Sequence, residues 1–152
     1  MTSIKKIAFC TDFSDNSNEA FELAVDLTVK YQARLFMVHV VPPLVFPSPV
    51  MEEFISEQAS LQFYKDAIRW ATEQIESVYL NKLGKSLQAE VRVLSGHPAS
   101  EILNFLEQEE IDLVVMGTHG LAGLAHFFLG STAEKVVRRA SCSVLTVHPK
   151  KA

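Results

Sequence analysis

Cysteine is nearly absent from this sequence of 152 residues, in which Cys10 and Cys142 are the only two. Two cysteines so far apart form neither a disulfide framework nor a CxxC motif of the kind that binds zinc or performs redox chemistry. We expect both to be small thiols packed in or beside the core, because free cysteine behaves as a small hydrophobic residue.

An excess of basic charge and a long hydrophobic run are also missing. Lys and Arg number 14 against 18 Asp and Glu, so the formal net charge is −4, which argues against a nucleic-acid partner or an anionic membrane surface. No stretch approaches the roughly 18 uncharged apolar residues of a membrane span, and the N-terminal residues run into a strand pattern without a signal-peptide core. We therefore expect a cytoplasmic protein with no membrane or nucleic-acid partner.

The remaining composition is that of an ordinary globular protein, with 48% hydrophobic and 21% charged residues. A chain of this length fits one domain with its own core. No internal repeat, low-complexity tract or linker interrupts it. We expect a single domain over residues 1–152.

Short β-rich segments alternate with helical patterns along the chain. Strands are expected at 4–10, 34–41, 87–94, 111–116 and 143–148, and helices at about 16–31, 51–83, 98–108 and 130–140. Asn16 with Glu19, and Ser131 with Glu134, have the spacing of a capping box, so each pair predicts a helix start. Gly84 is expected to end the long helix.

This alternation predicts an α/β fold in three layers, a five-stranded parallel sheet of order 3-2-1-4-5 with helices on both faces. Ligands of such folds bind beyond the carboxyl ends of the strands, where the strand order reverses. Attention therefore falls on residues 11–14 and on the loop after the fourth strand. Cys10 and Cys142 fall at opposite ends of this sheet, about 17 Å apart, which is too far for a disulfide.

The loop after the fourth strand is rich in glycine. Gly117 and Gly120 follow the strand directly, where glycine permits a positive φ and a close approach of backbone amides to a ligand. Gly130 opens the next helix, whose N-terminal N–H groups and dipole suit a phosphate. One continuous helix over 121–140 is the alternative, but its two glycines would each weaken it by about 1 kcal/mol, so we favour two segments. The loop is not a Walker A motif, because no lysine precedes Ser131.

Three motifs resemble the universal stress protein family. Residues 117–131 read G-T-H-G, nine residues and G-S, which is similar to the family's ATP signature G-x2-G-x9-G-[ST]. Residues 11–14 (T-D-F-S) resemble the start of the family's first loop, and residues 39–40 (H-V) resemble the end of its second strand. The order of elements matches as well, so the resemblance covers essentially the whole chain and implies an adenine nucleotide alpha hydrolase-like fold.

The resemblance implies an ATP site with Mg²⁺ or Mn²⁺. Asp12 would lie beside the adenosine, Val40 would present its backbone to the adenine, and the glycine loop would line the phosphates. The full candidate set is Thr11, Asp12, Val40, Met116, Gly117, His119, Gly120, Gly130, Ser131 and Thr132. Ser143 stands where the family often has proline, away from the phosphate loop.

Individual side chains keep a structural interpretation beside the functional one. Asp12 either contacts a ligand or bonds the amides of the turn that follows it, and the resemblance favours the ligand. His119 either donates to a phosphate or takes no part. His39 is interpreted as structural or solvated.

Three functions remain open. The first is an ATP-binding regulatory or stress-response module with slow hydrolysis at most, because no base or catalytic arginine can be identified from spacing. The second is a dimeric family member that needs no nucleotide, which the intact glycine spacing disfavours. The third is an enzyme of the ATP pyrophosphatase type, which needs an SGGxDS loop where residues 10–14 read C-T-D-F-S.

The final strand, residues 144–147, is uncharged and β-rich, and it is an edge strand in the expected order. A bare apolar edge invites another chain, and two-fold pairing with the same strand of a second copy satisfies both edges. The family resemblance points the same way. The alternative is that the long helix or the proline-rich segment 42–49 covers this edge. We favour a homodimer through this strand.

Overall fold

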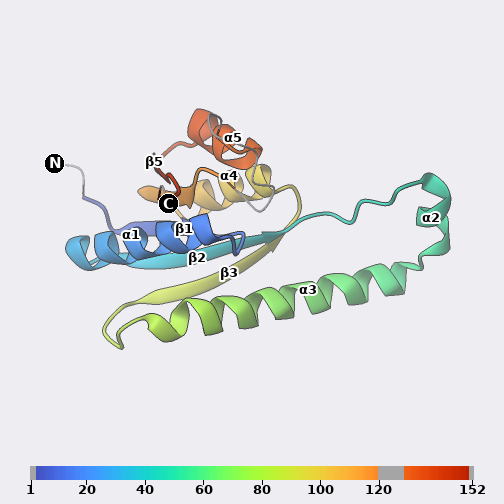
Figure 1. Cartoon of the computed structure of the whole chain (residues 1–152), viewed down its shortest axis with the longest axis horizontal. Coiled ribbons are helices and arrows are strands. Elements are labelled where there is room, and N and C mark those ends of the chain that lie inside the picture. Colours follow the sequence, from blue (N-terminus) through green and yellow to red (C-terminus); the bar gives the residue numbers. More distant parts are fainter. Residues whose placement is uncertain (1–2, 120–128, 151–152) are drawn as a thin grey trace.

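The fold is given by a computed structural model that describes residues 3–119 and 129–150 (Figure 1). In chain order its elements are β1 (Lys6–Cys10), α1 (Asp15–Tyr31), β2 (Arg34–Val41), α2 (Pro49–Phe54), α3 (Glu57–Val78), the 3-10 turn η1 (Leu80–Lys82), β3 (Ala89–Ser95), α4 (Pro98–Gln108), β4 (Leu113–Gly117), α5 (Ser131–Arg139) and β5 (Ser143–Val147). The nine predicted elements are therefore present, with ends shifted by a few residues, except that the long helix is divided.

The five strands form one sheet of order β3-β2-β1-β4-β5. All four pairings are parallel, and the register places Phe9 beside Met37 on one side and Val115 on the other. The central strands are almost continuously apolar and buried, as expected of a parallel sheet covered on both faces. The predicted fold class and strand order are confirmed.

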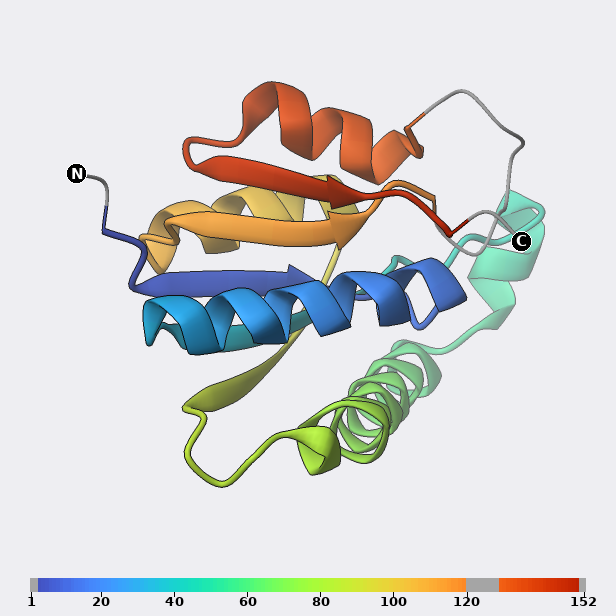
Figure 2. The ribbon, with the colours of Figure 1, turned by 60° about the vertical axis from the view of Figure 1, so that its left-hand side comes forward.

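Each face of the sheet has its own core, because strand side chains alternate between the two faces. Ala8, Val38 and Val114 pack on one face under α4 and α5. Phe9 and Met37 pack on the other face under α1 and α3. Figure 2 shows α1 in front of the sheet and α4 behind it.

Two predicted helix caps are wrong. The N-cap of α1 is Ser14, whose Oγ accepts the N–H of Ser17 at 3.2 Å. Asn16 lies in the first turn, and its side chain serves another contact, described below. The N-cap of α5 is Gly130, without a side-chain cap, so Ser131 is the first helical residue rather than its cap. Residue spacing alone does not distinguish a capping side chain from one that binds elsewhere.

The predicted helix over 51–83 is also wrong in its continuity. Ile55 has extended backbone angles, and Ser56 starts a new helix by accepting the N–H of Ala59. The helix α3 ends at Val78, before the expected terminator Gly84. Its C-terminal half lies on β2 and β3, whereas α2 and the N-terminal half of α3 extend beyond the sheet (Figure 1).

Cys10 and Cys142 are both free, as predicted. Cys10 lies beside Met116 at the carboxyl end of β1, and Cys142 precedes Ser143 at the opposite end of β5. Within the described residues, no helix has the length and apolar character that a membrane crossing requires.

Candidate functional site

A cavity of about 300 Å³ lies at the carboxyl ends of β1, β2 and β4, where the strand order reverses. Nine of the ten predicted site residues line it, namely Thr11, Asp12, Val40, Met116, Gly117, His119, Gly130, Ser131 and Thr132. The tenth, Gly120, lies outside the described residues. The β1 turn, the end of β2 and the N-terminus of α5 therefore meet around one space.

The turn after β1 carries Asp12 at the cavity wall. Asp12 Oδ1 accepts the backbone N–H of Ser14 at 3.0 Å and the hydroxyl of Ser17 at 2.6 Å. Phe13 has a φ of 65°, in the left-handed region that non-glycine residues seldom adopt. The carboxylate thus bonds the turn, and it also faces the cavity, so the two interpretations of Asp12 are compatible.

Thr11 makes hydrogen bonds to three other residues. Its carbonyl accepts His39 Nδ1 at 2.8 Å, and its Oγ1 accepts the N–H of Phe13 at 3.0 Å. The same Oγ1 lies 2.9 Å from the hydroxyl of Tyr79, which donates to Asn18 Oδ1, also at 2.9 Å. Tyr79 is the C-cap of α3 and fully buried, so α3 supports the floor of the turn.

Two titratable side chains on the cavity wall are kept neutral. Burial lowers the pKa of His39, although the bond to Thr11 and the charge of Asp12 act in the opposite direction. Since a carbonyl can only accept, Nδ1 carries the proton of the neutral imidazole. Burial raises the pKa of Cys10 to about 12, so its thiol stays protonated and unreactive.

Asn16 connects α1 to the loop after β4. Its Oδ1 accepts the N–H of His119 at 2.9 Å, and its Nδ2 donates to the carbonyl of Val147 at 2.9 Å. A Cβ at Gly117 would lie 2.6 Å from Asn16 Oδ1. Gly117 does not have the positive φ that we expected of it. It is glycine because the amide of Asn16 occupies the space of a side chain.

His119 belongs to the loop after β4 and lines the cavity. Its Nδ1 lies 2.7 Å from the hydroxyl of Thr118, whose own N–H donates to the carbonyl of Val147 at 3.0 Å. His119 Nε2 is buried and has no hydrogen-bond partner among the described residues. A buried polar atom without a partner is costly, and His119 is one of the residues that line the cavity.

The N-terminus of α5 opens onto the same space. Gly130 lies in an extended conformation, and its N–H donates to the carbonyl of Thr118. Because glycine has no side chain, no cap covers the first-turn amides of Ser131 and Thr132, both at the cavity wall. Amides and a positive helix end directed at a cavity suit an anion.

A divalent cation fits this site only together with a ligand. Among the described residues no group of three His, Cys, Asp or Glu side chains could hold a metal. Asp12 is the one carboxylate among the described lining residues. Mg²⁺ is often bound through one or two carboxylates plus substrate phosphates, and a single aspartate is compatible with that arrangement.

Several contributing residues were not predicted. In the sequence, Tyr79 has the pattern of one more apolar position of a long helix. The spacing of Asn16 and Glu19 indicates a helix cap. His39 was interpreted as structural, and it does bond Thr11, but it also lines the cavity. Its position at the end of a strand beside β1 is a signal that could have identified it.

Comparison with known proteins gives consistent results. The model of the Universal stress protein family matches residues 3–148. The universal stress protein MJ0531 of Methanocaldococcus jannaschii is 36% identical over 151 residues, which cover 97% of this chain and 84% of the relative. The solved structure of hypothetical protein MJ0577 has a TM-score of 0.84 at 22% identity and covers 99% of this chain and 100% of that one. A universal stress protein solved in complex with cAMP has a TM-score of 0.60 at 24% identity and covers 97% and 98%. The chain belongs to the universal stress protein family.

Proposed function

We propose that the cavity binds ATP and that the chain is a nucleotide-dependent regulatory or stress-response module. The observation that carries this is the meeting of an uncapped helix N-terminus with the ends of β1 and β2 around one space. His119, whose Nε2 has no hydrogen-bond partner among the described residues, lines the same cavity. The cAMP complex of a protein with the same fold supports an adenine nucleotide as the ligand class.

The nucleotide would lie with its base on the apolar part of the wall. Val38 and Val40, in the second half of β2, and Ile102, in the middle of α4, belong to this part. Asp12 would contact the ribose or a Mg²⁺ carried by the phosphates. The phosphates would lie against the N–H groups of Ser131 and Thr132, where the helix end stabilises negative charge.

We propose that ATP is held and hydrolysed slowly if at all. Fast phosphoryl transfer needs cationic groups at the phosphate and a base or polar group that orients the attacking oxygen. No lysine or arginine is present among the described lining residues, and Asp12, their one carboxylate, already bonds Ser14 and Ser17. The site is therefore better suited to binding than to turnover.

A homodimer through β5 is part of this proposal. The strand is an edge of the sheet, and α3 lies on β2 and β3 rather than over it. The Ser143 N–H and the Val147 carbonyl both bond toward β4. Because these directions alternate along a strand, Val144 and Thr146 direct their backbone groups to the open edge. Two copies can pair there.

The nucleotide proposal is tested by what the protein carries. Freshly purified recombinant protein is denatured by heat, and the released nucleotide is identified by anion-exchange chromatography. We expect ATP. Protein that releases no nucleotide and shows no saturable binding of ATP would contradict the proposal and leave the nucleotide-independent dimer.

A further inference from the structure

The turn after β1 is packed against aromatic rings of β2 and α3. The ring of Phe13, the residue that follows Asp12, lies among three others, with centroid distances of 4.6 Å to His39, 5.4 Å to Trp70 and 6.4 Å to Tyr79. His39 belongs to β2, whereas Trp70 and the C-cap Tyr79 belong to α3. The turn that carries Asp12 to the cavity is therefore in contact with a helix on its other side.

The backbone of Phe13 needs such support. Its φ of 65° lies in the left-handed region, which a residue with a side chain keeps only where its surroundings hold it there. Two hydrogen bonds contribute, from the Phe13 N–H to Thr11 Oγ1 and from the Ser14 N–H to Asp12 Oδ1, each at 3.0 Å. Both bonds lie within the turn, so the packing of the Phe13 ring is a contact that holds the turn from outside.

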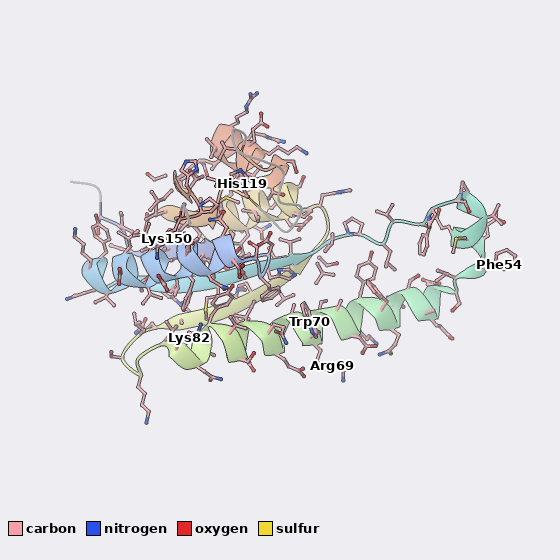
Figure 3. The ribbon with its side chains drawn as sticks, in the orientation of Figure 1. Phe54, Arg69, Trp70, Lys82, His119 and Lys150 are labelled. Atoms are coloured by element: carbon pink, nitrogen blue, oxygen red, sulfur yellow. The ribbon has the colours of Figure 1, made fainter. Side chains whose placement is uncertain are left out.

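Trp70 makes this contact from a half-exposed position. It is 53% exposed, although the next residue, Ala71, is fully buried. Figure 3 shows Trp70 about midway along α3, between the half that lies on the sheet and the half that extends beyond it. The planes of the Trp70 and Phe13 rings meet at 76°, an edge-to-face arrangement that aromatic pairs favour. Neither ring belongs to the described lining of the cavity.

We propose that Trp70 is a positioning residue for the nucleotide site, and that it acts through Phe13 to hold Asp12 at the cavity wall. If the Phe13 ring leaves its place, its backbone can return to an ordinary φ. That rotation separates the Ser14 N–H from Asp12 Oδ1, and the carboxylate loses its direction. The importance of the turn for binding rests on the proposed function, whereas the contact between Trp70 and Phe13 does not.

Trp70 separates positioning from direct contact with a ligand. His39 also packs on Phe13, but it lines the cavity itself. Tyr79 bonds Thr11 and Asn18 through its hydroxyl, so its loss has consequences beyond the ring contact. A tryptophan that only fastens α3 to the sheet would contribute to stability and leave the affinity of folded molecules unchanged. A positioning tryptophan changes that affinity.

The size of the effect follows from one aromatic pair. Such a pair favours its conformation by a factor of roughly 2 to 12 beyond the area that the rings bury. Only molecules with the turn in place bind the ligand, so the apparent affinity falls with their fraction. We expect Trp70→Ala to raise the Kd for ATP with Mg²⁺ about 5-fold, and Trp70→Phe, which keeps a ring, to stay within about 2-fold of wild type.

The matched control is Phe63→Ala. Phe63 lies two helical turns before Trp70 on the same side of α3, is 46% exposed, and packs its ring on Tyr64. This variant should bind ATP as the wild type does. In a protein that already carries Phe13→Leu, adding Trp70→Ala should change the Kd by less than about 2-fold, because the contact is already lost. Binding is measured by calorimetry at a temperature at which circular dichroism shows every variant folded.

A measurement without ligand tests the contact itself. By NMR, hydrogen exchange of the Phe13 and Ser14 amides should be about 5-fold faster in Trp70→Ala than in wild type or Phe63→Ala, because the turn opens more often. Unchanged exchange at both amides would overturn the proposal, and so would equal Kd values for wild type and Trp70→Ala. A wild type that binds no ATP would instead contradict the proposed function, and the exchange rates would still decide whether Trp70 holds the turn.

Discussion

The contact between Gly117 and Asn16 yields a quantitative prediction. An alanine at position 117 would place its Cβ 2.6 Å from Oδ1 and 2.9 Å from Cγ of Asn16. The asparagine must then move, which breaks its bonds to the N–H of His119 and to the carbonyl of Val147. The carbonyl keeps the N–H of Thr118, but the amide of His119 loses its partner.

The expected loss follows from these bonds. One net hydrogen bond contributes about 1 kcal/mol, and an orphaned buried N–H costs about 1–3 kcal/mol. Replacing glycine with alanine returns about 0.4–1 kcal/mol by restricting the unfolded chain. Gly117→Ala should therefore destabilise the protein by about 2 kcal/mol, a fall in Tm of roughly 4–8 °C.

A double-mutant cycle isolates the contact. Asn16→Ala removes the obstructing amide, so adding Gly117→Ala to it should change the free energy of unfolding by less than about 0.5 kcal/mol, a coupling of about 2 kcal/mol. The assay is urea unfolding followed by circular dichroism. If Gly117→Ala were equally destabilising with and without Asn16, the close approach would not be the reason for glycine at this position.

Three further predictions concern the turn after β1, the cavity wall and the sheet edge. Tyr79→Phe deletes the hydroxyl shared with Thr11 and Asn18 and should lower the free energy of unfolding in urea by about 1–2 kcal/mol; no change would show that water replaces these bonds. Burial lowers the pKa of His39 below its ordinary 6.5, so the unfolded state binds a proton more readily than the folded state. The stability that the neutral His39 contributes should therefore be present above pH 6.5 and be lost as the pH falls below that value. His39→Gln should flatten that slope in unfolding measured from pH 7.5 to 5.5, and an identical slope would contradict the assignment. Thr146→Pro removes an N–H of β5 that is directed to the open edge, so the variant should have half the mass of the wild type by light scattering. An unchanged mass would show that β5 is not an interface.

Much of the fold follows from local patterns in the sequence. Strands such as β4 are apolar throughout because both faces of the sheet are covered, and α4 begins where Pro98 predicts it. The divided helix could not be predicted, because Phe54 and Ile55 belong to an apolar stripe of helical spacing that continues past the break. The break also depends on the capping role of Ser56, which residue spacing leaves open.

The predicted site residues were those that follow strands or open a helix, and topology brings nine of them to one cavity. The supporting residues were missed for a common reason. Asn16 and Tyr79 act over 103 and 68 residues of separation, on His119 and Thr11. Contacts at such distances depend on how helices pack on the sheet, and a single sequence carries no local pattern for them.

The central claim, that this cavity binds ATP, is tested most directly by calorimetric titration of ATP with Mg²⁺ into three proteins: wild type, Gly130→Val and Gly84→Val. Gly130 is the cap of α5 at the cavity, whereas a Cβ at Gly84 has only Ser86 Oγ nearby, at 3.9 Å. We expect one ATP per chain for wild type and Gly84→Val. For Gly130→Val we expect an affinity lower by about 100-fold or more, since losing two charge-assisted hydrogen bonds of about 1.5 kcal/mol each removes about 3 kcal/mol. Equal affinity in all three proteins, or no binding by the wild type, would contradict the account.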